Sequence, residues 1–210
     1  MSTKPVRPTT ILLQPQEPAA KGPAAPSLQA FLELAFRPLY LAGTGWALVA
    51  IALWIYAPGL LTGPLGGIAW HAHEMLWGFI ATIALAFLMT AGASWTGITP
   101  MTGRFLAVVC ALWVCARVGY LLPWETAFWV AMAAELAFFL SGAVAMMRAV
   151  VISKNSRNYA VPGLLAGLGG IDALYLLTAR DGDYLLLMQR FNSGLVVMAL
   201  IALLIGRRVI

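Results

Sequence analysis

Residues 71–91 read HAHEMLWGFIATIALAFLMTA, with two histidines and a glutamate at the start of a long apolar run. From residue 75 to residue 91 the run holds no charged side chain. A helix of about 20 apolar residues crosses a hydrocarbon core about 30 Å thick. The stretch therefore predicts a transmembrane helix, because a strand of a membrane barrel would alternate apolar with polar residues.

The rest of the chain follows the same pattern. Of its 210 residues, 61% are hydrophobic and only 10% are charged, against roughly 25% charged residues in soluble domains. Apolar stretches long enough to cross a bilayer occupy residues 39–56, 71–91, 105–122, 126–147, 159–178 and 184–205. We therefore predict an all-α polytopic membrane bundle of six transmembrane helices over residues 34–210. Residues 1–33, rich in proline and poor in apolar side chains, are expected to form a disordered cytoplasmic tail.

Basic residues are distributed unevenly among the predicted loops. Ten of the thirteen lie in the tail, between spans two and three, after span four or after span six, namely Lys4, Arg7, Lys21, Arg37, Arg104, Arg148, Lys154, Arg157, Arg207 and Arg208. The loops on the other side hold only Arg180 among several acids. Because cytoplasmic loops are enriched in Lys and Arg, this predicts that both termini lie in the cytoplasm. The net charge of +5 then reflects topology, and no nucleic-acid partner is predicted.

Ionisable side chains inside a membrane helix cost about 2.5–3.5 kcal/mol at its centre by insertion scales, so they mark candidate functional sites. The predicted spans contain His71, His73, Glu74, Arg117, Glu135, Asp172 and Arg190. Counted along each helix from its outer end, all fall in the outer half of the bilayer, with the buried acids Glu135 and Asp172 closest to the middle. The sequence thus predicts a polar pocket that faces outward. The alternative is that the arginines reach to the interface and the two acids make ordinary interhelical hydrogen bonds.

The His-x-His-Glu element contains the only two histidines of the chain. Imidazole is the commonest metal ligand in proteins. At 100° per residue, His71 and His73 point about 200° apart, so one helix does not direct both at one metal. His71 and Glu74 share a face, which suits a carboxylate that orients a ligating imidazole. Trp70, His73 and Trp77 line another face able to flank a porphyrin, although Trp70 also suits the aromatic belt of a membrane.

Residues 70–79, WHAHEMLWGF, resemble the signature of the NnrS family of bacterial membrane proteins. Further matching segments are FRP at 36–38, FLMTA at 87–91, WTG at 95–97, Trp113 with Arg117, RNY at 157–159, and Gly206 with RVI at 208–210. The resemblance covers about residues 35–210. It implies a multi-pass protein of the bacterial inner membrane that binds haem and copper and belongs to the response to nitric oxide, often in organisms that denitrify.

Within that resemblance, His71, His73 and Glu74 are the candidate metal ligands. Trp70, Trp77, Arg117 and Arg190 are the candidate cofactor-binding residues, the arginines pairing with haem propionates. Family members run to about twice this length, so the chain resembles their first half. Since two axial histidines normally come from different helices, a second copy or a separate chain would supply the missing helices, or a methionine would be the second ligand, or the site never assembles.

Two other classes of function stay open. One is a half-transporter that works as a dimer, with Glu135 and Asp172 carrying protons or cations. The other is a half-length membrane subunit that packs against a partner. No pairing of a nucleophile with a base is evident in the sequence, so it leaves open whether the protein is an enzyme.

Overall fold

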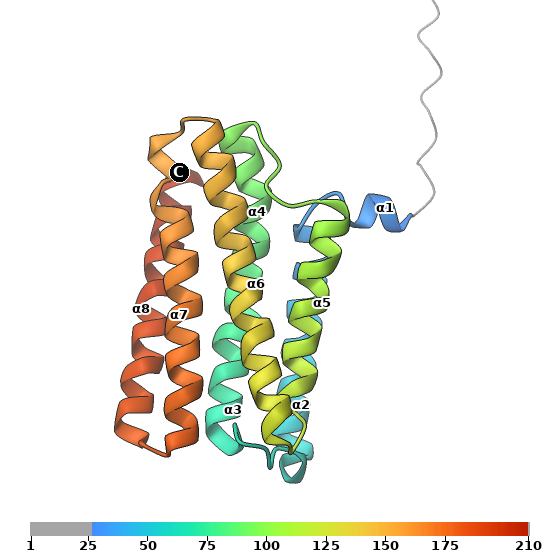
Figure 1. Cartoon of the computed structure of the whole chain (residues 1–210), viewed down its shortest axis with the longest axis vertical. Helices are drawn as coiled ribbons and strands as arrows, with labels where there is room; N and C mark the ends of the chain where they lie inside the picture. The colour runs from blue at the N-terminus through green and yellow to red at the C-terminus, as the bar shows by residue number, and fades with distance from the viewer. Residues whose placement is uncertain (1–26, 210) are drawn as a thin grey trace, which may run out of the picture.

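A computed structural model describes residues 27–209 as a bundle of long helices that run side by side (Figure 1). No strand occurs among these residues, which agrees with the all-α prediction. In chain order the elements are α1 (Leu28–Phe31), α2 (Phe36–Tyr56), η1 (Pro58–Leu60), α3 (Gly67–His73), η2 (Glu74–Ala81), α4 (Thr82–Thr96), α5 (Gly103–Gly119), α6 (Glu125–Ile152), η3 (Ser156–Asn158), α7 (Ala160–Asp181) and α8 (Tyr184–Val209).

Within residues 27–209, five helical segments are long and apolar enough to cross a membrane. They are Phe36–Tyr56, Gly67–Thr96, Glu125–Ile152, Ser156–Asp181 and Tyr184–Arg207. The third span expected from the sequence corresponds to α5, which has 17 residues and a length of about 25 Å. This helix lies beside α2 and α6 in Figure 1. The structure thus bears out a membrane bundle with five such helices and adds a shorter α5.

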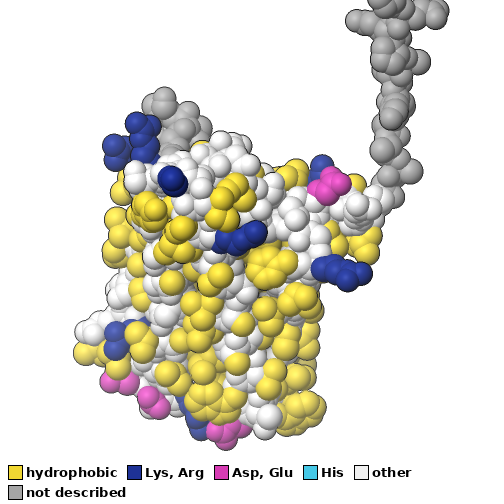
Figure 2. Space-filling model, turned by 45° about the horizontal axis from the view of Figure 1, so that its top comes forward, with side chains coloured by type: hydrophobic (Ala, Val, Ile, Leu, Met, Phe, Trp, Pro, Cys, Tyr) yellow, Lys and Arg dark blue, Asp and Glu magenta, His cyan; other side chains and the backbone are white. Residues whose placement is uncertain are grey.

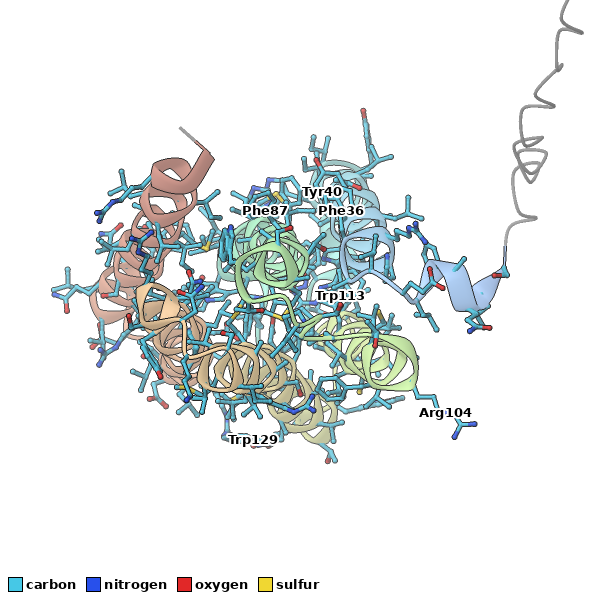
Figure 3. The ribbon with its side chains drawn as sticks, turned by 90° about the horizontal axis from the view of Figure 1, so that it is seen from above. Phe36, Tyr40, Phe87, Arg104, Trp113 and Trp129 are labelled. Carbon is cyan, nitrogen blue, oxygen red and sulfur yellow. The ribbon has the colours of Figure 1, made fainter. Side chains whose placement is uncertain are left out.

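The helix that carries the His-x-His-Glu element, and that begins at Gly67, is the central one. It runs without a break through α3, η2 and α4, and 61% of its most apolar stretch is buried, against 22% for α2 and 11% for α8. Viewed along the bundle, α4 is flanked by α2, α5, α6, α7 and α8 (Figure 3). The flanking helices leave one side open, between α2 and α8, where Phe87 lies. Small residues such as Ala81 and Ala86, both fully buried, allow this close packing.

Most basic side chains lie at one end of the bundle and most exposed acidic side chains at the other (Figure 2). The basic end carries Arg104 near the start of α5, Arg148 near the end of α6, and Lys154 just after α6. The acidic end carries Glu125 and Asp181, where α6 begins and α7 ends. Between the two ends the surface is mostly apolar, as a lipid-facing bundle requires.

The predicted tail lies mostly outside the described residues, since residues 1–26 are not described. Its last part differs from the prediction, because Leu28–Phe31 form the short helix α1. The Ser27 side chain caps this helix by accepting a hydrogen bond from the Ala30 amide at 3.1 Å. The Gly103 amide donates to the Leu32 carbonyl at 2.8 Å, which holds the segment against the start of α5.

Candidate functional site

The site is built around η2, a π-helical segment of eight residues that begins at Glu74. Here the chain makes a wider turn than an α-helix, a feature that occurs often at functional sites. The Thr82 hydroxyl donates to the Trp77 carbonyl, five residues earlier, at 3.1 Å. Glu74 and Trp77 in this segment, and His73 just before it, are all fully buried.

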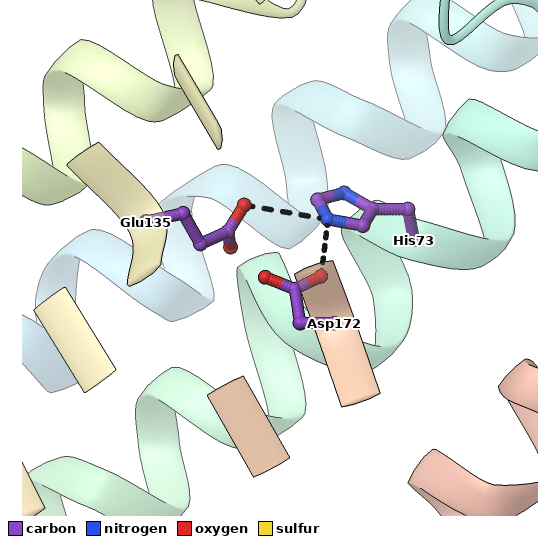
Figure 4. A group of neighbouring side chains, drawn as sticks. All are labelled: His73, Glu135 and Asp172. Carbon is purple, nitrogen blue, oxygen red and sulfur yellow. Dashed lines mark hydrogen bonds and ion pairs between the residues drawn. The ribbon is translucent and has the colours of Figure 1, made fainter. Parts of the chain in front are cut away.

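His73 lies between carboxylates on both sides of its ring. Its Nδ1 is 3.0 Å from Glu74 Oε1. Its Nε2 is 2.9 Å from Asp172 Oδ1 on α7 and 3.3 Å from Glu135 Oε2 on α6. Figure 4 shows Nε2 facing both of these acids. Three segments that are far apart in the sequence therefore meet at one imidazole.

Arg117, on α5, holds two of these carboxylates from the other side. Its Nη1 donates to Glu74 Oε2 at 2.6 Å, and its Nη2 donates to Glu135. The Trp46 indole of α2 also donates to Glu74 Oε2, at 2.5 Å. All of these side chains except Trp46 are at most 2% exposed. We call His73, Glu74, Arg117, Glu135 and Asp172 the buried polar cluster.

Aromatic rings and a glycine shape the space around the cluster. The His73 ring stacks on Trp77, with ring centroids 5.5 Å apart, and meets Tyr120 edge-on at 5.0 Å. Tyr175 also stacks on His73, with ring centroids 6.0 Å apart. Its hydroxyl donates to the Ala69 carbonyl at 2.8 Å, which links α7 to α3. Gly78 leaves room for the Arg117 guanidinium and the Glu74 carboxylate, since a Cβ at this position would collide with both.

The formal charges of the cluster do not balance. Three carboxylates, Glu74, Glu135 and Asp172, face one guanidinium, Arg117. With a neutral imidazole, the cluster carries two more negative than positive charges. An unbalanced charge in a buried, low-dielectric site is strongly unfavourable. The arrangement is therefore suited to take up cations, either protons or a metal ion.

A comparison with protein families gives a match, and it covers the residues that build this site. A family model described as NnrS protein matches residues 30–210. The chain belongs to the NnrS family. The matched region includes all five members of the buried polar cluster and every described helix from α2 to α8. Searches of the curated proteins and of the solved structures found no match.

In this NnrS-family chain, two of the predicted site residues lie apart from the cluster. The His71 ring stacks on Trp54 of α2, with centroids 4.8 Å apart and planes 19° from parallel. Arg190 is half-buried on α8 and makes no ion pair with any residue that the structure describes. The predicted pairing of Glu74 with His71 is likewise not found within 27–209, because Glu74 contacts His73, Arg117 and Trp46 instead.

The remaining predicted residues lie against the cluster. Trp77 stacks on His73, and its indole donates to the Leu168 carbonyl at 3.3 Å. Trp70 is fully buried and meets Trp46 edge-on at 6.4 Å, so it is a core residue and not part of an aromatic belt. Arg117, Glu135 and Asp172 come together as described above.

The predicted outward-facing pocket is a closed cluster in the structure. Its polar side chains lie in the half of the bundle nearer the acidic end, as expected, but packing against Trp77, Tyr120 and Tyr175 seals them off. Two cavities, of about 920 and 330 Å³, lie at the basic end instead. The cavity of about 920 Å³ is lined by Arg157 and Arg207, among others, and the cavity of about 330 Å³ by Thr99 and Arg148.

Sequence reasoning did not identify Trp46, Tyr120, Tyr175 or Gly78 as part of the site. Trp46 offered one signal, since an indole in the middle of an apolar helix needs an acceptor for its N–H. Tyr120 offered another, because it follows Arg117 by three residues and so shares its helix face. The acceptor of the first and the neighbours of the second depend on helix packing, which the sequence does not show.

Proposed function

We propose that this NnrS-family protein is a multi-pass protein of the bacterial inner membrane that binds haem and a metal ion in the response to nitric oxide. The observation that carries the metal-binding part of the proposal is the buried polar cluster, because five ionisable residues from four helical segments are costly to assemble in a membrane without a function. Family membership and the resemblance of residues 70–79 support the assignment.

The proposed topology has six spans with both termini in the cytoplasm. The five long helices and α5 make up the spans. The basic end, with Arg104, Arg148 and Lys154, then lies on the cytoplasmic side, in keeping with the enrichment of Lys and Arg there. The cluster lies in the outer half, since Glu135 is about 15 Å along α6 from its acidic end.

Haem fits at His71 better than at His73. Carboxylates contact both nitrogens of the His73 ring, and Trp77 and Tyr120 pack against the ring itself, which leaves no space for a porphyrin. The half-buried His71 has a buried Nδ1 without a hydrogen-bond partner among the described residues. Met75 and Ile80 follow His71 at intervals of four and five residues, about one helical turn each, so they lie on the same side of the helix as His71. This side reaches the surface, since Ile80 is 44% exposed. We propose that His71 ligates haem at this side of the helix, and a bound haem iron would supply the binding site for nitric oxide.

The expected pairing of His71 with Glu74, which share a helix face, as part of a metal site does not fit the structure. His71 stacks on Trp54, whereas His73 and Glu74 face each other and the rest of the buried polar cluster. We therefore derive no copper site from these three residues.

Optical spectra and metal analysis test the haem proposal. Detergent-purified protein is compared with the variants His71→Ala and Trp54→Phe, the second of which keeps an aromatic ring beside His71. We expect a Soret band and haem iron in the unaltered protein and in Trp54→Phe, and their loss in His71→Ala. A colourless, folded wild-type protein after expression with added haem precursor would overturn the proposal.

A second candidate function is a subunit that packs against further helices, from a second copy or a separate chain. The observation that favours it is α8, of which only 11% of the most apolar stretch is buried, together with the open side between α2 and α8. Cross-linking from cysteines placed at Val196 and Leu203, which are 59% and 70% exposed, tests this arrangement. A half-transporter is less well supported, because Glu135 and Asp172 are engaged inside the closed cluster.

A further inference from the structure

We propose that His73, Glu135 and Asp172 form a site for one divalent cation, of the class of Fe²⁺, Mn²⁺ or Zn²⁺. The three residues come from α3, α6 and α7 and are buried, and each offers one ligand atom, so that all three atoms lie within 4.8 Å of one another. This site is separate from the haem proposed at His71, and each stands or falls on its own evidence.

The spacing of the donor atoms is close to that around a bound metal. A divalent ion with bonds of about 2.0–2.2 Å has neighbouring donor atoms about 3.0–3.5 Å apart. In the structure, His73 Nε2 is 2.9 Å from Asp172 Oδ1 and 3.3 Å from Glu135 Oε2. Two of the three donor pairs therefore have the spacing found around a bound metal, and the third pair, Glu135 with Asp172, lies within 4.8 Å.

Glu74 prepares the imidazole for this role. A carboxylate only accepts hydrogen bonds, so the contact of Glu74 Oε1 with His73 Nδ1 at 3.0 Å indicates that this nitrogen carries a proton. Nε2 is likewise 2.9 Å from Asp172 Oδ1, so in the metal-free protein a proton lies between these two atoms. A metal ion would displace that proton and take the lone pair of Nε2, which is the atom that faces Glu135 and Asp172. A carboxylate that binds the far nitrogen of a ligating histidine is the usual arrangement behind a metal site.

Unpartnered oxygen atoms point to a missing ligand. Glu135 Oε2 is buried and lies 3.3 Å from His73 Nε2, but it makes no hydrogen bond of normal geometry within the described part of the chain. The hydroxyl of Tyr120, a residue that is 3% exposed, is also buried without a partner among those residues. The Tyr120 ring meets His73 edge-on at 5.0 Å, so both of these oxygen atoms belong to residues that adjoin the same imidazole. Buried polar atoms are nearly always satisfied in native proteins, and a bound ion would satisfy Glu135.

Charge selects a divalent ion. With the neutral imidazole that a ligand requires, Glu74, Glu135 and Asp172 leave two negative charges beyond the one that Arg117 balances. A divalent cation cancels this excess, whereas a monovalent ion leaves one buried charge. Because the dielectric constant inside the bundle is low, the free-energy cost of that remaining buried charge is large.

The donor set also indicates the class of metal. It contains one imidazole nitrogen and two carboxylate oxygens and no sulfur. Thiolate and thioether ligands select Cu⁺, whereas imidazole with carboxylates suits Fe²⁺, Mn²⁺ and Zn²⁺. The site is therefore a poor one for Cu⁺.

The test measures binding of the metal alone to detergent-purified protein. After removal of metals with a chelator, the protein is titrated with Zn²⁺ and with Mn²⁺, and bound metal is counted per chain by elemental analysis. The variants are Asp172→Asn and Glu135→Gln, which keep side-chain shape. The control is Glu125→Gln, which alters an exposed acid at the start of the same helix α6.

We expect one Zn²⁺ or Mn²⁺ per chain in the wild-type protein and in the control, with affinity at least about 10-fold lower in each cluster variant. Zn²⁺ should also raise the melting temperature of the wild type and the control. Asp172→Asn should still show a melting transition, which shows that it is folded, but Zn²⁺ should not raise its melting temperature. A folded wild type without bound Zn²⁺ or Mn²⁺ would overturn the proposal, and so would unchanged affinity in both variants; in either case protons alone would balance the cluster.

The same titration separates this site from the haem. His71→Ala should lose the Soret band and keep the bound Zn²⁺ or Mn²⁺. Loss of both signals in a folded His71→Ala protein would contradict the assignment of two separate sites. Absence of haem from all proteins, with normal Zn²⁺ binding, would overturn only the proposed haem site.

Discussion

His73 Nε2 lies 2.9 Å from Asp172 Oδ1, although 99 residues separate the two along the chain. This contact joins α3 to α7 at the point where η2 begins. It is one of several polar contacts that fix the central helix against its neighbours, since Glu74 is held by Arg117 of α5 and Trp46 of α2. The stability of the bundle and the integrity of the site therefore depend on the same side chains.

Replacement of Arg117 should be strongly destabilising. Arg117→Gln leaves the carboxylates of Glu74 and Glu135 buried without their cation, and breaking a buried ion pair in this way costs about 3–5 kcal/mol. Reversible unfolding in mixed micelles measures the change in the free energy of unfolding. Arg180→Gln is the control, because its pair with Glu125 is exposed and should contribute about 1 kcal/mol or less. Equal effects of the two substitutions would contradict the structural role of the cluster.

Gly78 should not tolerate a methyl group. In Gly78→Ala, the new Cβ would collide with the Arg117 guanidinium and the Glu74 carboxylate, so the cluster must open. We expect a loss of about 1–3 kcal/mol, as for overpacking of a core, together with weaker Zn²⁺ binding. Gly163→Ala, on α7, meets no atom within 4 Å and should be neutral or slightly stabilising because alanine favours helix by about 1 kcal/mol. Thermal melts of both variants in one detergent decide the matter.

Trp46→Phe should weaken the hold on Glu74. The substitution keeps an aromatic ring but removes the indole N–H that donates to Glu74 Oε2 at 2.5 Å. Hydrogen bonds to charged groups contribute about 1.5–3 kcal/mol, and a loss of that size is the expected change in the free energy of unfolding. Trp129→Phe serves for comparison, because its indole donates to Glu125 at an exposed position and at 3.4 Å. A larger effect at Trp129 than at Trp46 would show that the buried contact is unimportant.

The proposed orientation is tested by labelling single cysteines. The native Cys110 and Cys115 are first replaced by alanine, and then a cysteine is placed at Ser156 or at Asp183, both exposed and at opposite ends of the bundle. In intact spheroplasts, a membrane-impermeant maleimide should label Asp183→Cys and not Ser156→Cys. Labelling of Ser156→Cys from outside, without labelling of Asp183→Cys, would reverse the topology.

The sequence alone determined the main features of the bundle. Runs such as residues 75–91 must form helices because an apolar solvent leaves each backbone to satisfy its own hydrogen bonds. Small residues such as Ala81 and Ala86 recur along span two and permit close helix packing, and the structure buries both fully. The depth of Arg117, Glu135 and Asp172 could also be read by counting residues along each helix, because the rise per residue is constant.

Only the tertiary structure decided which of these groups meet. Helical spacing favoured a pairing of Glu74 with His71, whereas the structure pairs Glu74 with His73, Arg117 and Trp46. A buried charge must find a partner, but its partner depends on the rotation and depth of helices that lie 40 to 100 residues apart in the chain. These are set by side-chain packing at positions such as Gly78 and by the wide turn of η2, and neither leaves a periodic signal in the sequence.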